Sequence, residues 1–114
     1  MPNPVVHFEV LGTNAEATQS FYAGVFDWPM EKVMDTYAMV KPGGETDIPG
    51  GVGSAMPGSS GHSTFYVEVE DLQTTLEKIE AAGGSTVQPP MDVPGGPSIA
   101  LFHDPDGNLV GLVK

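Results

Sequence analysis

The feature that most constrains the fold of this chain is a repeat in the order of its secondary-structure signals. In each half, a run of β-forming residues is followed by an amphipathic helix and then by about three more short apolar runs. Two candidate helix N-caps, Asn14 and Asp71, superpose the halves with an offset of half the chain length. The repeat predicts two strand–helix–three-strand (βαβββ) modules.

The first half carries short, closely spaced elements. Strands are expected over Val5–Leu11, Met30–Met34, Tyr37–Val40 and Val52–Met56. A helix is expected over Ala15–Phe26, in which Ala17, Phe21 and Val25 form an apolar stripe that packs on a sheet. The Gly/Pro-rich stretch Lys41–Gly51 is expected to be a loop.

The second half repeats this order. Strands are expected over Ser63–Val69, around Val87, over Ile99–Phe102 and over Leu109–Val113. A helix follows Asp71, with Leu72, Leu76 and Ile79 on its apolar face and Gly83–Gly84 as its stop. A loop is expected over Gln88–Pro97, and a tight hairpin turn at Asp104–Asn108.

These elements indicate an α+β fold, with two βαβββ modules in tandem that form curled mixed sheets around a cleft. A single module of this size buries too little surface to be stable alone. We therefore expect one domain over residues 1–114, with module one at 1–57, a linker at 58–62 and module two at 63–114.

The charge of the chain limits the classes of partner that it is expected to bind. The formal net charge of −11 opposes binding to nucleic acids and to anionic membranes. It would tolerate or attract cationic ligands, although an acidic, solvated surface is the simpler interpretation. The chain has no cysteine and no long apolar run, and its N-terminus shows no secretory signal. A cytoplasmic location is expected.

Several motifs resemble those of the vicinal oxygen chelate superfamily, which includes glyoxalase I, bleomycin-resistance proteins and extradiol dioxygenases. They are the repeated module, FYAGVFDW at the end of the first helix, DLQTTLEKIEAAGG in the second half and DPDGN near the end. The resemblance covers nearly the whole chain and is more specific for the fold than for the function, because one fold hosts several chemistries.

The resemblance implies metal ligands on the first and last strands of each module, facing the cleft. The first-strand positions are His7 and Thr64, seven residues before each N-cap, and the last-strand position of the second half is Gly111. The corresponding strand of the first half has no His, Asp or Glu. Because a divalent catalytic metal usually needs three protein ligands, we expect no metal site and no cofactor.

His7 and Glu9 are the strongest candidate site residues, because they lie two apart on one strand and share a face. His7 could bind a ligand or act as a base near pH 7, although an interior histidine is the simpler interpretation. The other expected ligand-binding residues are Trp28, Tyr37, Tyr66, Phe102 and His103, for which packing in the core or bracing of the turn is the simpler alternative.

The resulting hypothesis is a metal-free protein that binds a small organic molecule in the cleft, with catalytic residues unknown. The alternative is a lyase, isomerase or dioxygenase of the same superfamily that uses His7 with an atypical ligand set, or metal-free acid–base chemistry by His7 and Glu9. A homodimer is expected, because exposed strand edges are usually covered and relatives of the bleomycin-resistance type pair in this way.

Overall fold

The computed structural model describes residues 2–45 and 47–114. Met1, in the first predicted module, and Thr46, in the first predicted loop, lie outside the described residues. The chain forms two compact units, an N-terminal unit of His7–Thr64 and a C-terminal unit of Phe65–Lys114 together with residues 2–6. Its organisation as a single domain with a linker at 58–62 stays a prediction.

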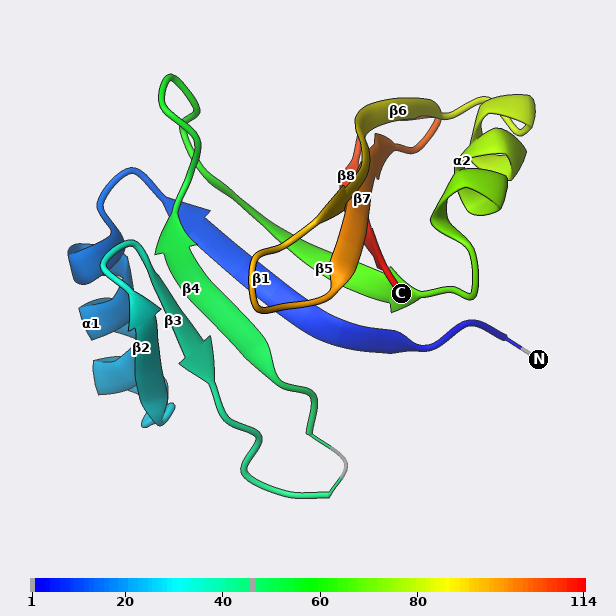
Figure 1. Cartoon of the computed structure of the whole chain (residues 1–114). Helices are drawn as coiled ribbons and strands as arrows, with labels where there is room; N and C mark the ends of the chain where they lie inside the picture. Colours follow the sequence, from blue (N-terminus) through cyan, green and yellow to red (C-terminus); the bar gives the residue numbers. More distant parts are fainter. Residues whose placement is uncertain (1, 46) are drawn as a thin grey trace. The chain divides into compact units, whose positions relative to one another are not determined.

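The N-terminal unit has a four-stranded mixed sheet and one helix (Figure 1). Its elements are β1 (Val5–Gly12), of which residues 7–12 lie in this unit, α1 (Ala15–Phe26), β2 (Met30–Met34), β3 (Tyr37–Val40) and β4 (Gly50–Ser54). The strand order is β2-β3-β4-β1, in which β1 and β4 pair in parallel and the other pairs are antiparallel.

The C-terminal unit repeats this topology. Its elements are β5 (His62–Glu68), of which residues 65–68 lie in this unit, α2 (Leu72–Ala81), β6 (Ser85–Asp92), β7 (Ser98–His103) and β8 (Leu109–Val113). The strand order β6-β7-β8-β5 again has one parallel pair, β5 with β8. Two βαβββ modules with mixed sheets are therefore confirmed, and so is the α+β class.

Both predicted N-caps are confirmed, and each has a physical cause. The side chain of Asn14 accepts a hydrogen bond from the backbone N–H of Ala17 at 2.9 Å, and that of Asp71 accepts one from Thr74 at 2.8 Å. Each cap residue has extended backbone and satisfies an N–H that the first helical turn leaves without a partner.

The predicted apolar face of α2 forms the core of the C-terminal unit. The buried cluster consists of Val69, Leu72, Leu76, Ala100 and Leu112. Ile79 and Phe102 pack against this cluster and stay partly exposed. The alternation of side chains along β7 and β8 places Ala100 and Leu112 on the face that α2 covers.

The predicted apolar stripe of α1 is wrong. Ala17 is exposed, and the side chains of Phe21 and Val25 are 57% and 56% exposed. The helix instead buries Ala15 and Gln19, and the Gln19 side-chain amide donates to the backbone carbonyl of Val52 on β4 at 3.0 Å. This bond satisfies a buried polar side chain, so a residue that looks solvent-facing in the sequence occupies the packed face.

Two predicted loops are shorter in the structure, since strands extend into them. Gly50 and Gly51 belong to β4, and β6 continues through Asp92 despite Pro89 and Pro90. The pairing of β6 with β7 is irregular between Gln88 and Met91. Proline lacks an N–H, but an irregular strand at the edge of the unit's sheet loses little by it. In the same way, β5 already begins at His62, inside the predicted linker.

The predicted turn at the end of the chain is confirmed. The Asp104 side chain accepts hydrogen bonds from the backbone N–H groups of Asp106 and Asn108, both at 2.9 Å, and Gly107 has a φ of 88°. This turn joins β7 to β8. Among the described residues, no helix is long and apolar enough to cross a membrane.

Candidate functional site

The structure brings together three of the seven predicted site residues, His7, Glu9 and Tyr37, within the N-terminal unit. The Tyr37 hydroxyl lies 3.1 Å from Nε2 of His7 and 2.9 Å from Oε2 of Glu9. His7 and Glu9 come from one face of β1, and Tyr37 from the start of β3. All three side chains are partly buried. They form one hydrogen-bonded chain, which we call the His7–Tyr37–Glu9 triad.

Glycines of β4 allow Tyr37 to reach across that strand to β1. Tyr37 pairs with Gly53, and its ring runs along β4 until the hydroxyl stands over Gly51, which pairs with Glu9. A Cβ added to Gly51 would stand 1.7 Å from the Tyr37 hydroxyl oxygen, and one added to Gly53 would stand 2.8 Å from the ring atom Cδ1. Any side chain at Gly51 would therefore displace the phenol.

Gly51 contributes to the site although the Gly/Pro-rich pattern around it predicts a loop, because it belongs to β4. A detectable signal lies in the run Gly51-Val52-Gly53, which follows a strand of β-forming residues after a short connection. Glycine inside a strand often marks a place where another group approaches the backbone closely. The glycines indicate such a close approach only if the run is recognised as part of a strand.

The hydrogen bonds of the triad have a direction. A carboxylate only accepts, so the single hydroxyl hydrogen of Tyr37 goes to Glu9. The Tyr37 oxygen then accepts from His7, which makes Nε2 the protonated nitrogen of the neutral ring. Through Tyr37, the position of the hydrogen on the His7 ring therefore depends on the carboxylate of Glu9.

Burial lowers the pKa of His7, and the negative charge of Glu9 opposes this shift without cancelling it. The imidazole is therefore neutral at physiological pH. A neutral histidine next to a carboxylate can accept a proton or exchange hydrogen bonds with a bound molecule.

Trp28 lies on the other face of the N-terminal sheet, away from the triad. Its ring stands 5.1 Å from that of Phe8, 5.3 Å from that of Tyr22 and 5.6 Å from that of Phe26, measured between centroids. Phe8 alternates with His7 and Glu9 along β1, so this cluster belongs to the side that α1 covers. The structure does not bring Trp28 together with the triad.

The other three predicted site residues belong to strands of the C-terminal unit. Phe102 packs against the α2 core, while Tyr66 alternates with the core-facing Val67 and lies on the opposite face. His103 pairs with Leu109 directly before the Asp104 turn and, by alternation, shares the face of Tyr66. Tyr66 is 7% exposed, and its ring lies over Gly111.

The donors at the positions of the implied metal site do not fit a catalytic divalent metal. The register pairs Glu9 with Gly51 and Tyr66 with Gly111, so neither last strand offers a ligand beside the first strand of its unit. His7 and Glu9 are both bonded to Tyr37. Across residues 2–45 and 47–114, no group of three or more His, Asp or Glu side chains is arranged to hold a metal ion.

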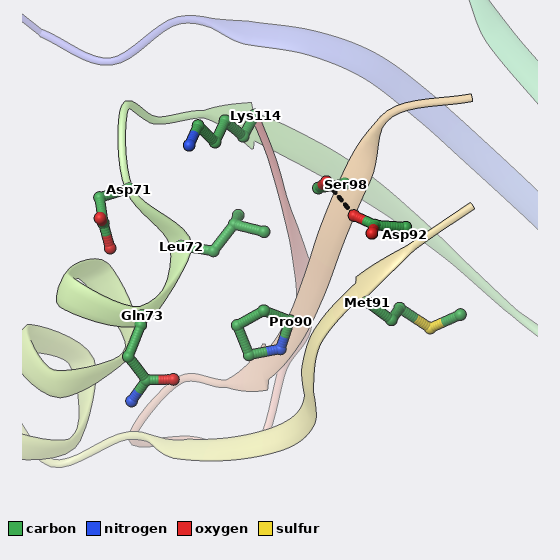
Figure 2. Close-up of a pocket in the computed structure, with 8 residues that line it drawn as sticks. All are labelled: Asp71, Leu72, Gln73, Pro90, Met91, Asp92, Ser98 and Lys114. Carbon is green, nitrogen blue, oxygen red and sulfur yellow. Dashed lines mark hydrogen bonds between the residues drawn. The ribbon is translucent and has the colours of Figure 1, made fainter. Parts of the chain in front are cut away.

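A separate hollow of about 490 Å³ lies in the C-terminal unit and contains none of the seven predicted site residues (Figure 2). It is lined by Asp71, Leu72, Gln73, Pro90, Met91, Asp92, Ser98 and Lys114. Its acidic groups already serve the fold, because Asp71 caps α2 and Asp92 accepts from the Ser98 hydroxyl, the bond drawn in Figure 2. The triad, in which side chains of β1 and β3 bond to one another over β4, is the stronger candidate site.

Comparisons with known proteins agree with this architecture. The model of a family described as the Glyoxalase/Bleomycin resistance protein/Dioxygenase superfamily matches residues 5–112. The CFP32 protein of Mycobacterium tuberculosis (strain CDC 1551 / Oshkosh) is 28% identical over 109 residues, which cover 93% of this chain and 42% of CFP32. Anthracycline biosynthesis protein DnrV of Streptomyces peucetius is 28% identical over an alignment of 127 positions that covers 93% of this chain and 45% of DnrV. The chain spans less than half the length of these two relatives.

Solved structures show the same fold. A methylmalonyl-CoA epimerase of Streptomyces coelicolor, in complex with 2-nitronate-propionyl-CoA, superposes with a TM-score of 0.68 at 17% sequence identity. The superposition covers 99% of this chain and 94% of the epimerase chain. At this identity the likeness concerns the fold alone.

Proposed function

Because the chain belongs to the Glyoxalase/Bleomycin resistance protein/Dioxygenase superfamily, we propose that it binds a small organic molecule on the face of β1, β3 and β4 that carries the triad, without a catalytic metal. The observation that carries the proposal is the hydrogen-bonded chain of His7, Tyr37 and Glu9. Placing a carboxylate and an imidazole in partly buried positions costs solvation. A fold can retain such groups when they recognise a ligand.

The charges favour a neutral apolar or cationic molecule over an anion. Glu9 places a carboxylate in the triad while burial keeps His7 neutral, and the whole chain carries a net charge of −11. An anionic ligand would meet repulsion both locally and at long range. The half-buried ring of Tyr37 adds an aromatic surface that suits an apolar body or a cation.

The second candidate is a metal-free enzyme that moves a proton. The observation in its favour is the direction of the triad, in which a neutral His7 donates to Tyr37 and Tyr37 donates to Glu9. A ligand proton accepted by His7 would leave an imidazolium that Glu9 stabilises through the phenol. The donor set favours this version of the enzyme over one that depends on a metal.

We also propose a cytoplasmic homodimer that does not bind nucleic acid. The net charge argues against nucleic acid, and β2 is a strand at the edge of the N-terminal sheet, which homodimers often cover. Sedimentation of the protein at low and high salt would test the dimer. Repulsion between acidic chains should weaken it at low salt, and a monomer at both salt concentrations would contradict it.

Ligand binding can be tested by NMR titration of the purified protein with benzylamine, benzyl alcohol and benzoate, which share one ring and differ in charge. We expect shifts of the His7, Glu9 and Tyr37 resonances with the first two probes and none with benzoate. Tyr37→Phe should weaken binding by about tenfold, because His7 and Glu9 both lose the hydroxyl group that holds their side chains in place.

The matched control is Tyr22→Phe, which removes the same hydroxyl from the aromatic cluster on the α1 side. It should leave binding unchanged. Benzoate binding at the triad, or equal effects of the two substitutions, would contradict the proposed ligand class. Shifts confined to the hollow beside α2 would place the site elsewhere.

A further inference from the structure

In each unit a tyrosine ring lies over a glycine of the last strand. The Tyr37 hydroxyl covers Gly51 on β4, and the Tyr66 ring covers Gly111 on β8. A Cβ on Gly111 would stand 2.4 Å from both Cδ2 and Cε2 of Tyr66, and one on Gly51 would stand 1.7 Å from the Tyr37 hydroxyl oxygen. Real Cβ atoms essentially never approach a non-bonded heavy atom so closely.

The two glycines occupy equivalent places. Gly51 pairs with Glu9 across the parallel strands β1 and β4, and Gly111 pairs with Tyr66 across β5 and β8. Glu9 and Tyr66 are related by the same offset that relates the two N-caps, Asn14 and Asp71. The tyrosines reach these equivalent glycines by different routes, since Tyr66 comes from the paired strand itself and Tyr37 from the strand on the other side.

We propose that Tyr37 and Tyr66 occupy, within their own units, the space that a last-strand metal ligand would need, and that each tyrosine and its glycine form a sterically coupled pair. Gly111 is the position at which the family resemblance implies an acidic ligand. The Tyr66 ring fills that space, so exchanging Gly111 for a carboxylate cannot by itself create a ligand there. A phenol group takes the place of a metal-binding group in each unit.

The coupling predicts that an added methyl group at the glycine destabilises the protein when the tyrosine is present and stabilises it when the tyrosine is removed. With the ring present, a methyl group at the glycine overpacks the strand. With the ring removed, the three atoms nearest to this methyl group are gone, and the methyl group reduces the conformational freedom of the unfolded chain, which favours folding. Both pairs should behave in this way, because both glycines have a negative or extended φ and no backbone strain of their own.

A double-mutant cycle of Gly111→Ala and Tyr66→Ala, followed by thermal melting, tests the pair in the C-terminal unit. We expect Gly111→Ala to lower Tm by roughly 5 °C beside Tyr66 and to leave Tm unchanged or raised in the Tyr66→Ala background. The equivalent cycle of Gly51→Ala and Tyr37→Ala covers the case in which Tyr66→Ala does not fold, since Tyr37 is only partly buried. An equal Tm shift in both backgrounds would overturn the coupling.

Metal uptake tests the second part of the proposal. Wild-type protein and Gly111→Glu are incubated with Ni²⁺, Zn²⁺ or Mn²⁺, desalted and subjected to elemental analysis, with Gly24→Glu as a control. Gly24 has open space around its Cβ position and receives the same charge. We expect less than one equivalent of metal in all three proteins. One tightly held equivalent in Gly111→Glu alone would show that Tyr66 does not block the position.

These experiments separate the steric coupling from the proposed function, because neither uses an organic ligand. A failed titration with benzylamine and benzyl alcohol would remove the proposed function and leave the coupling intact. Equal Tm shifts in the cycles would remove the coupling, while binding at the triad could still be observed.

Discussion

Tyr37 and Gly51 compete for one volume, because a Cβ on Gly51 would stand 1.7 Å from the phenol oxygen that joins His7 to Glu9. The geometry of the triad therefore depends on a residue that contributes no functional group of its own. A substitution at Gly51 is therefore the most direct way to disturb the geometry of the triad.

Gly51→Ala should lower the free energy of unfolding by about 1–3 kcal/mol, because the phenol must move out of a packed position. Urea denaturation would measure the loss. Gly24→Ala is the matched control, since Gly24 lies in α1 with open space around it and the substitution should stabilise that helix by about 0.5–1 kcal/mol. Equal stability of Gly51→Ala and the wild-type protein would contradict the close approach of Tyr37.

In Tyr37→Phe, the neutral ring of His7 should lose its preference for carrying its hydrogen on Nε2. In the wild-type protein, the neutral ring carries its hydrogen on Nε2, because the hydroxyl hydrogen of Tyr37 is donated to Glu9. The ¹⁵N shifts of the imidazole above pH 7.5 or so report the tautomer directly. Tyr22→Phe should leave the shifts as they are, and an Nδ1–H tautomer in the wild-type protein would contradict the proposed direction of the chain.

The stability of the protein should fall as the pH is lowered through the titration of His7. Burial lowers the folded-state pKa of His7 below its ordinary value of 6.5, so around and below that pH the unfolded chain binds more protons than the folded one. The stability that depends on neutral His7 is therefore fully present above pH 6.5, and it is lost as the pH falls toward the lower pKa of the folded state. His7→Gln should flatten the dependence of the unfolding free energy on pH below about 6.5, relative to the wild-type protein. Parallel curves for the variant and the wild-type protein would contradict this assignment.

Gly107→Val should destabilise the hairpin of β7 and β8. Gly107 has a φ of 88°, a left-handed conformation that strains a β-branched residue by about 1–3 kcal/mol. Gly107→Asn should cost less, because asparagine tolerates this region better. Thermal melting of both variants would measure the difference, and equal Tm values would show that the strain does not depend on the side chain.

Local signals predicted most of the fold. The bounds of α1, β2, β3 and β8 match the expected ones, because capping residues and turn residues act within a few positions. The errors arose where tertiary contacts decide. Gln19 is buried because a β4 carbonyl faces it, and β6 continues through two prolines because it lies at an edge.

Only part of the candidate site could be predicted in the same way. His7 and Glu9 follow from alternation along one strand, which is a local property. That Tyr37 joins them depends on the pairing of β3 with β4 and on the absence of a side chain at Gly51. Strand register is a non-local property, so no pattern within one segment could place the phenol. Trp28 shows the same limit, since its partners come from β1 and α1.

The Asp104 turn has a consequence for the order in which the C-terminal unit folds. The turn closes through its own hydrogen bonds, so β7 and β8 can pair as a local hairpin on a timescale of about 1–10 μs. The parallel pairing of Tyr66 with Gly111 joins positions far apart in the chain and pays a larger loop-closure cost. We expect Gly107→Ala to slow refolding and Gly111→Ala mainly to accelerate unfolding, which stopped-flow chevron plots of the two variants would distinguish.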